Sequence, residues 1–272
     1  MRQVSSTADR AMTPDAEVRT KQRCLGPLDS RLTREGGQER TSMGFDLERT
    51  FATGFFGALS RDSDLRGEIV AAMTECLSRY DTGPWENRFI VGGVFEQILG
   101  SAARELGLHV QNAGARLQGY DLELADDRGI SVKFASGRVQ RSARFRLTNS
   151  QGAAGAWRRG TLFVQTGLGI GYADPDLAPG ITTTSGDGKS LDIYLLPLLG
   201  LWGVEAPPAR PATSLPPQAQ VTFAPDPRYF LHLPIPERPK IRAPRLASDP
   251  IARDVLSSGK TERLRRAYRD AI

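Results

Sequence analysis

The apolar residues of this 272-residue chain change their period near residue 110, and this change limits the folds open to the chain. Before this point apolar residues recur at the spacing of an α-helix, whereas beyond it short segments have the patterns of β-strands. The helical segments are 46–59, 64–80 and 86–107. The strand-like segments are 117–125, 129–135, 143–149, a stronger strand at 160–174, and a last strand around 221–224 and 229–233. Helices followed by strands predict an α/β or α+β fold, with a central mixed sheet flanked by helices.

Local signals predict three further features. Residues 191–202 have the composition of a short helix, and residues 249–271 have that of a basic helix. Asp64 is expected to be the N-cap of the helix 64–80, because a short polar acceptor there satisfies free backbone N–H groups.

The composition divides the chain into a core and polar flanks. Residues 1–42 carry many charges and few aliphatic side chains, so we expect a disordered leader that cannot offset its ordering entropy. Met43 opens the first hydrophobic segment, and a true start at this residue is a hypothesis. The other expected parts are a core with N-terminal helices, 43–205, a Pro-rich linker or loop, 206–220, and a C-terminal extension with the basic helix, 221–272.

Charge and cysteine content restrict the compartment and the partners. The net charge of +5 permits a nucleic-acid partner without requiring one. Cys24 and Cys76 form no metal-ligand or disulfide pattern, which predicts a reducing cytoplasm. The most apolar run, 191–204, is interrupted by Asp192 and Pro197 and is too short to span a bilayer. We therefore expect an intracellular, cytoplasmic protein that has no membrane partner.

The stretch GYDLELADDRGISVKFAS, residues 119–136, carries an unusual lysine. Only five of the 36 Lys and Arg residues are lysines, and one of them is Lys133 in this strand-like segment. Strand alternation places Asp121 and Glu123 on one face, and Ser131 and Lys133 on one face of the next strand. A lysine is a compact charge whose pKa can shift on burial, whereas arginine stays protonated.

On strands that bury aliphatic residues, placing a carboxylate and a lysine costs folding free energy unless a ligand or a catalytic role requires the pair. A Mg²⁺ ion would use it, with Asp121 as a ligand and Lys133 orienting or activating a bound water. The alternative is a plain salt bridge on an exposed face of the sheet.

Glycines surround one glutamate of the third helical segment. Gly92, Gly93 and Gly100 lie one turn before or after Glu96 and share its face. They expose the helix surface around this carboxylate, so that a sheet, a metal or a phosphate can come close. Tight packing of the helix on the sheet explains the glycines equally well.

These residues resemble the motif of the PD-(D/E)xK nuclease superfamily, whose fold is restriction-endonuclease-like. A glutamate on an early helix is followed by Asp121 on a strand, nine residues, and then Ser131-Val132-Lys133. The similarity covers residues 85–172. The sequence departs from the motif at Tyr120, where the family has proline, and at Ser131, the second acidic position.

The resemblance implies Mg²⁺-dependent hydrolysis of phosphodiester bonds, with Mn²⁺ able to substitute. It implies Asp121 and the relocated Glu96 as metal ligands, Glu123 as a reserve ligand, and Lys133 as the residue that positions or activates water. A type II restriction enzyme or a related defence nuclease is its most concrete form, with double-stranded DNA as substrate and a homodimer on palindromic sites. The alternatives are a DNA-binding protein of this fold without catalysis, favoured by Ser131, and a structural or interaction protein.

Arginines and amides follow the lysine strand. They can hold phosphates and read base edges, although a solvated basic edge strand is the alternative. These candidate DNA-binding residues are Arg138, Arg141, Arg144, Arg146, Asn149 and Gln151.

Overall fold

The structure is a computed structural model in which one compact unit spans residues 42–272. The residues that it describes are 44–80, 85–113, 120–125, 128–136, 139, 143–147, 156–184, 190–205, 226–235 and 248–271, with only the backbone described for 85–88 and 248–250. The expected leader, 1–42, and the expected linker, 206–220, lie outside these residues. The fold is mixed α and β, with helices against a mixed sheet, as the order of sequence patterns predicts.

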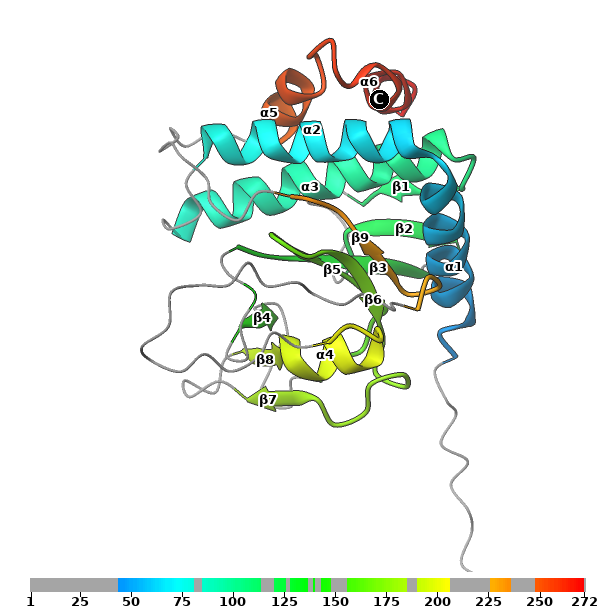
Figure 1. The fold of residues 1–272 in the computed structure, drawn as a ribbon, viewed down its shortest axis with the longest axis vertical. Coiled ribbons are helices and arrows are strands. Elements are labelled where there is room, and N and C mark those ends of the chain that lie inside the picture. Colours follow the sequence, from blue (N-terminus) through cyan, green and yellow to red (C-terminus); the bar gives the residue numbers. More distant parts are fainter. Residues whose placement is uncertain are drawn as a thin grey trace, which may run out of the picture. The chain divides into compact units, whose positions relative to one another are not determined.

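The three predicted N-terminal helices are present (Figure 1). They are α1 (Asp46–Arg61), α2 (Ser63–Arg79) and α3 (Trp85–Glu105). The expected N-cap of α2 was wrong by two residues. Asp62 is the cap, because its carboxylate accepts the backbone N–H of Leu65 at 2.9 Å, while Asp64 lies in the first turn.

The basic C-terminal segment forms two helices where the sequence predicted one. They are α5 (Ser248–Val255) and α6 (Glu262–Arg269). The chain turns between them at Thr261, a buried residue whose hydroxyl shares its proton between the carbonyls of Leu256 and Ser258, each 3.0 Å from Oγ1. This side-chain bonding competes with the helical pattern and ends α5 early.

A mixed sheet lies beside the helices, with the strand order β1-β2-β3-β5-β6-β9 (Figure 1). β3 and β5 are parallel, and the other described neighbours in this sheet are antiparallel. The strands are β1 (Gln111–Asn112), β2 (Leu122–Ala125), β3 (Arg128–Ala135), β5 (Thr161–Gln165), β6 (Gly169–Ala173) and β9 (Phe230–His232).

The strong strand expected over 160–174 is a hairpin of β5 and β6. Its turn contains Gly167, whose φ of 73° lies in the left-handed region that glycine adopts at low cost. Both strands are buried along their whole length, so their apolar residues form one continuous run. Such a run does not show where the chain reverses direction between the two strands.

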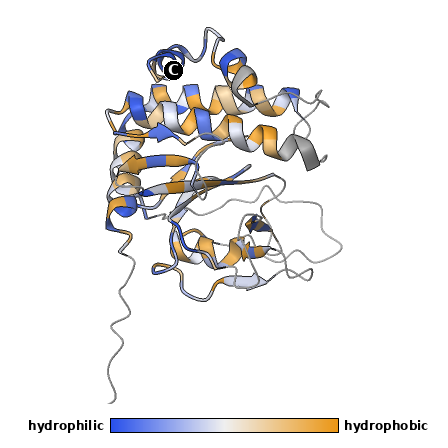
Figure 2. Ribbon diagram, turned by 180° about the vertical axis from the view of Figure 1, so that it is seen from behind, coloured by the Kyte–Doolittle hydropathy of each residue, from blue (hydrophilic) through white to orange (hydrophobic). Residues whose placement is uncertain are grey.

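One face of this sheet packs against helices. Leu122, Ile130 and Val132 belong to a core formed with side chains of α1, α2, α3, α5 and α6. Figure 2 shows apolar residues along the helices and strands that meet there. The rings of Phe95 on α3 and Phe134 on β3 are 4.8 Å apart, so α3 covers this face at the centre of the sheet.

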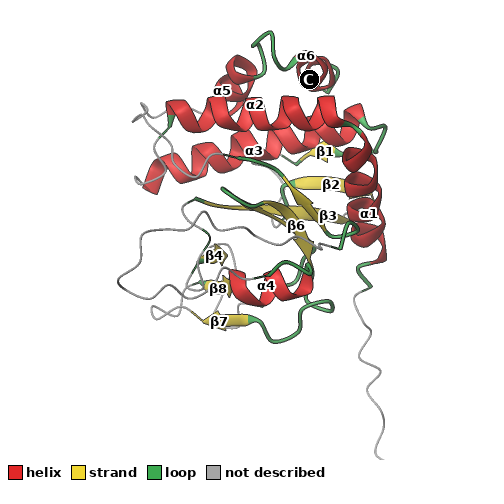
Figure 3. Cartoon of the chain, viewed as in Figure 1, coloured by secondary structure: helices red, strands yellow, loops and turns green. Residues whose placement is uncertain are grey.

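A second layer covers part of the other face (Figure 3). It contains a small antiparallel sheet in the order β4-β8-β7 and the helix α4 (Leu195–Leu201). The strands are β4 (Arg144–Leu147), β7 (Thr182–Thr184) and β8 (Leu191–Tyr194). The helix expected over 191–202 is therefore half strand and half helix. Phe163 of β5 packs here against Phe145 and Trp202, with ring centroids 4.8 and 6.3 Å apart.

Ion pairs join α1 to the sheet. Arg49 donates two hydrogen bonds of 2.8 Å to the fully buried carboxylate of Asp174, and Arg128 at the start of β3 pairs with buried Glu48. Among the helices in the described ranges, none has both the length and the apolar character needed to cross a membrane.

Candidate active site

Asp121 and Lys133, the central pair of the sequence motif, are in contact in the structure. Asp121 immediately precedes β2, and Lys133 lies within β3, the antiparallel neighbour. The Nζ atom of Lys133 is 3.4 Å from Oδ2 of Asp121. The two side chains are 26% and 23% exposed, so solvent or a ligand can reach the pair.

Asp121 also has a structural role. Its Oδ2 accepts the backbone N–H of Val132 at 2.5 Å, while its own backbone N–H donates to the carbonyl of Ile130 at 3.0 Å. The carboxylate thus continues the strand pairing beyond the first residue of β2. Its second oxygen, Oδ1, makes no hydrogen bond with the residues that the structure describes and remains available to a ligand.

The strand register places the neighbouring motif residues. Leu122 pairs with Ile130, so continuing the register by one residue sets Asp121 opposite Ser131. The serine therefore lies beside the carboxylate on the same face, where the family motif has its second acid. Glu123 pairs with Gly129, four residues along β3 from Lys133. At about 3.3 Å per residue, this separation is roughly 13 Å.

Glu96 lies on α3, on the helix-covered side of the sheet. Its side chain is partly exposed, and its backbone carbonyl accepts a hydrogen bond of 3.0 Å from the Asn112 side chain. The structure shows no hydrogen bond or ion pair between Glu96 and either Asp121 or Lys133. Phe134 lies on the face of the sheet that α3 covers. Strand alternation therefore places Lys133 on the opposite face.

The glycines around Glu96 differ in their surroundings. A Cβ on Gly100 would lie 2.5 Å from Oδ1 of Asn112, so this glycine permits close packing of α3 on β1. A Cβ on Gly92 would meet nothing within 4 Å. Tight packing of α3 on the sheet therefore accounts for Gly100 but not for Gly92, where the helix surface is open.

Arg159, which no sequence motif indicated, lies next to the motif residues. Its guanidinium lies over the ring of Tyr120, 5.1 Å from the centroid, and Tyr120 directly precedes Asp121. The parallel pairing of β3 with β5 brings this arginine near the motif, because Ser131 pairs with Thr161 and donates its N–H to Gly160. Arg159 forms no ion pair with a described carboxylate. The Arg158-Arg159-Gly160 sequence before a strong strand was the signal available.

Two of the predicted DNA-binding arginines lie on β4 and share one acidic partner. Arg144 and Arg146 are 3.4 and 2.9 Å from the carboxylate of Asp192 on β8, whose side chain is 5% exposed. The arginine side chains are 47% and 43% exposed, so solvent can reach both guanidinium groups. The other predicted DNA contacts lie outside the described residues: Arg138, Arg141, Asn149 and Gln151.

The described part of the chain gathers no group of three or more His, Cys, Asp or Glu side chains suited to holding a metal. The site instead contains one carboxylate with an available oxygen beside one ammonium, and Arg159 lies over the ring of Tyr120, the residue before Asp121. Such a set can bind a phosphate and one hard cation. No family model, no curated protein and no solved structure gives a significant match to the chain.

Proposed function

We propose that the chain is a Mg²⁺-dependent endonuclease that hydrolyses phosphodiester bonds in double-stranded DNA, as a type II restriction or defence nuclease. The proposal depends on the contact between Asp121 and Lys133 on adjacent strands of a mixed sheet. The described order of α3, the antiparallel β1-β2-β3 and the parallel β5 is compatible with the restriction-endonuclease-like core that the motif implies.

The residues fit a Mg²⁺ ion to a limited extent. Mg²⁺ is commonly held by one or two carboxylates together with water and substrate phosphates, and Oδ1 of Asp121 is one such ligand atom. Ser131 offers a hydroxyl where the motif has a second carboxylate. Glu96, the relocated ligand that the motif implies, lies on the other side of the sheet, so water and substrate phosphate would complete the coordination shell. When bound, the metal would polarise the phosphodiester and lower the pKa of a water molecule.

The side chains of this site would act on the substrate in distinct ways. Lys133 would hydrogen-bond the attacking water or the phosphate, since its ammonium is held beside Asp121 and its side chain is 26% exposed. Arg159 would bind a DNA phosphate, because its planar guanidinium is oriented by the Tyr120 ring and has no described acidic partner. Arg144 and Arg146 would extend the positive surface along β4.

A DNA-binding protein without catalysis is the second candidate. It is favoured by Ser131, which places a hydroxyl and not a carboxylate beside Asp121. In this case Asp121 would serve the strand pairing through Val132, and the arginines would still bind phosphates.

The decisive experiment is cleavage of plasmid DNA with and without Mg²⁺ by the wild-type protein, by Lys133→Ala and by Lys133→Arg. We expect discrete, metal-dependent fragments from the wild type and a loss of about 100-fold or more in both variants, since arginine keeps its proton. Lys260→Ala is the matched control, because Lys260 is exposed in the turn between α5 and α6.

Three outcomes would count against the nuclease. Salt-dependent DNA binding without cleavage of methylated and unmethylated DNA would favour the non-catalytic candidate. Equal cleavage by wild type and Lys133→Ala would place the active site elsewhere. The absence of any DNA binding would overturn both candidates.

A further inference from the structure

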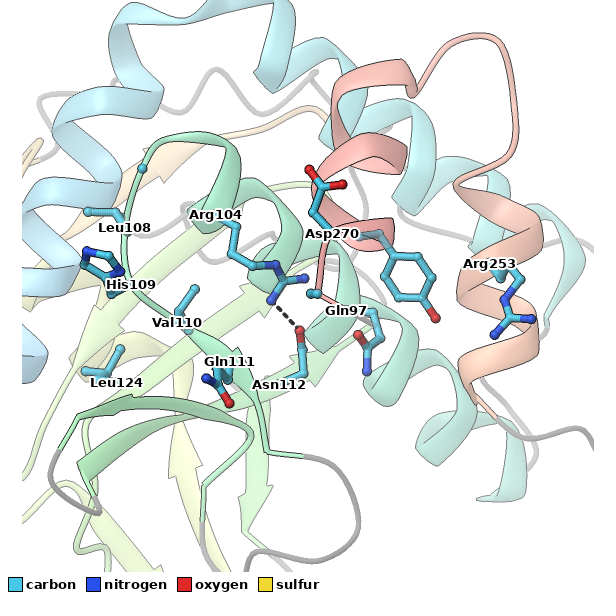
Figure 4. A pocket seen from close by; sticks show the side chains of 13 residues that line it. Gln97, Arg104, Leu108, His109, Val110, Gln111, Asn112, Leu124, Arg253 and Asp270 are labelled. Atoms are coloured by element: carbon cyan, nitrogen blue, oxygen red, sulfur yellow. Dashed lines mark hydrogen bonds between the residues drawn. The ribbon is translucent and has the colours of Figure 1, made fainter.

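A cavity of about 800 Å³ lies away from Asp121 and Lys133, between α3, β1 and the C-terminal helices (Figure 4). Leu124 lines it from the helix-covered face of the large sheet, whereas Lys133 belongs to the opposite face. The cavity is therefore separate from the candidate active site. Its volume falls within the range of small-molecule sites.

Arg104, at the last turn of α3, faces this cavity. Its Nε donates to the carbonyl of Ala267 at 3.2 Å, Nη1 to Asn112 at 2.9 Å, and Nη2 to the hydroxyl of Ser101 at 3.1 Å. All three acceptors are neutral, and a guanidinium has five N–H donors. No carboxylate among the described residues forms an ion pair with this arginine.

The environment of Arg104 disfavours its charge. Burial lowers the pKa of its guanidinium below the usual value, unlike that of Arg263 nearby, which hydrogen bonds to Asp62 and Glu105 raise. A partly buried cation without an acidic partner costs free energy that an anion would offset. Asp270 also lines the cavity, but in Figure 4 its carboxylate is turned away from the Arg104 guanidinium.

We propose that this cavity binds a small organic phosphate, with Arg104 holding the phosphate group. The described contacts leave two of the five Arg104 donors available, which is the number that a bidentate pair with a phosphate uses. This site is independent of the proposed nuclease activity, because it uses none of the residues of the candidate active site.

The rest of the lining suits the organic part of such a ligand. Arg253 projects from α5, on the other side of the cavity from Arg104, and adds a second positive charge (Figure 4). Gln97 and Gln111 offer amides that can both donate and accept hydrogen bonds. Apolar contact surface comes from Leu108, Val110 and Leu124. A ring that carries polar edges, as in a nucleoside monophosphate, matches this combination.

The test is calorimetric titration of the full chain with adenosine 5′-monophosphate, inorganic phosphate and adenosine. We expect saturable one-to-one binding of the monophosphate and binding of adenosine that is at least about 10-fold weaker, because the neutral nucleoside leaves Arg104 without an anion. Binding of inorganic phosphate should be weaker than that of the monophosphate, since it makes no apolar contacts. No saturable binding of either phosphate probe would overturn the proposal.

Variants connect the binding to the cavity. Arg104→Lys should weaken monophosphate binding about 10-fold, because lysine lacks the planar pair of donors. Arg253→Ala should weaken it about 3-fold or more through loss of the second charge. Arg253 is exposed and donates no side-chain hydrogen bond to the described residues, so this variant stays informative even if Arg104→Lys fails to fold.

Arg61→Ala, on the exposed end of α1, should bind the monophosphate as the wild type does. Unchanged binding by Arg104→Lys and Arg253→Ala would show that the ligand binds elsewhere. Binding of a duplex oligonucleotide that Arg104→Lys weakens, in the absence of any monophosphate binding, would assign the cavity to nucleic-acid backbone and would make the small-ligand proposal wrong.

Discussion

One carboxylate oxygen of Asp121 accepts the backbone N–H of Val132 at 2.5 Å and lies 3.4 Å from Nζ of Lys133. The same side chain thus extends the strand pairing and positions the lysine. Its effects on stability and on chemistry can be separated by substitution, because an amide keeps the acceptor and loses the charge.

Asp121→Asn is expected to lower cleavage about 100-fold or more while changing the free energy of unfolding by less than about 1 kcal/mol. Asp121→Ala should lose the activity and also about 1–3 kcal/mol, because the Val132 N–H loses its partner. Urea denaturation and plasmid cleavage measure the two effects. An active Asp121→Asn variant would remove Asp121 from the proposed chemistry.

Arg159→Ala is expected to weaken DNA binding about 5-fold or more, since the arginine is held over Tyr120 without an acidic partner. Arg228→Ala is a matched control, because Arg228 lies over Tyr229 at 5.3 Å but pairs with Asp226 on an exposed turn. Fluorescence anisotropy with a labelled duplex measures both affinities. Equal affinities for the two variants would exclude Arg159 from the DNA contact.

Arg144→Ala is expected to reduce the slope of log affinity against log salt by about 1, which corresponds to one lost phosphate contact. The fold should persist, because Arg146 keeps the closer contact to the buried carboxylate of Asp192. Affinities measured across a salt series give the slope, with Arg61→Ala as the control. A slope unchanged by Arg144→Ala would mean that Arg144 does not contact a DNA phosphate.

Gly171→Ala is expected to destabilise the fold by about 3 kcal/mol, because the added Cβ would lie 2.3 Å from the buried indole of Trp202. Gly92→Ala, in the middle of α3 with open space around its Cβ, should stabilise the fold by about 0.5–1 kcal/mol. Thermal or urea unfolding of the pair measures the contrast. Loss of DNA cleavage in a stabilised Gly92→Ala would indicate that the substrate approaches α3 at this glycine.

Stability should fall in acid partly through Asp62. Its hydrogen bond with Arg263, together with the bond from the Leu65 N–H, holds the pKa of this carboxyl below its usual range in the folded chain. A carboxyl whose folded pKa is depressed stabilises the fold above its unfolded pKa, and this contribution is lost as the pH falls through the folded value.

Asp62→Asn keeps a helix cap but loses the charge. It should lower the free energy of unfolding by about 1 kcal/mol near pH 7 and leave it unchanged in strong acid. Unfolding curves of Asp62→Asn and of the exposed control Asp64→Asn, recorded between about pH 2 and pH 7, measure this difference. A cost for Asp62→Asn that does not depend on pH would contradict the role of the ion pair.

Local sequence patterns determined the elements around the candidate site. The helical period predicted α1, α2 and α3, and strand alternation placed Asp121 and Lys133 on one face of neighbouring strands. Both inferences work because the side-chain direction repeats within a few residues of the chain. The short stretch between Asp121 and Lys133 makes their pairing a local event as well.

Contacts between residues far apart in the chain follow from the packing of whole elements. Arg159 reaches Tyr120 through the parallel pairing of β3 with β5, and Asp192 takes Arg144 and Arg146 through the pairing of β4 with β8. The cavity beside Arg104 likewise requires α6 to pack against α3. Each of these contacts joins residues that are about 40 or more positions apart in the chain. The periodicity of apolar residues within one segment carries no information about such distant partners. Local patterns in the chain therefore predict the elements and the faces on which their side chains lie, whereas long-range packing sets which charged groups meet a partner.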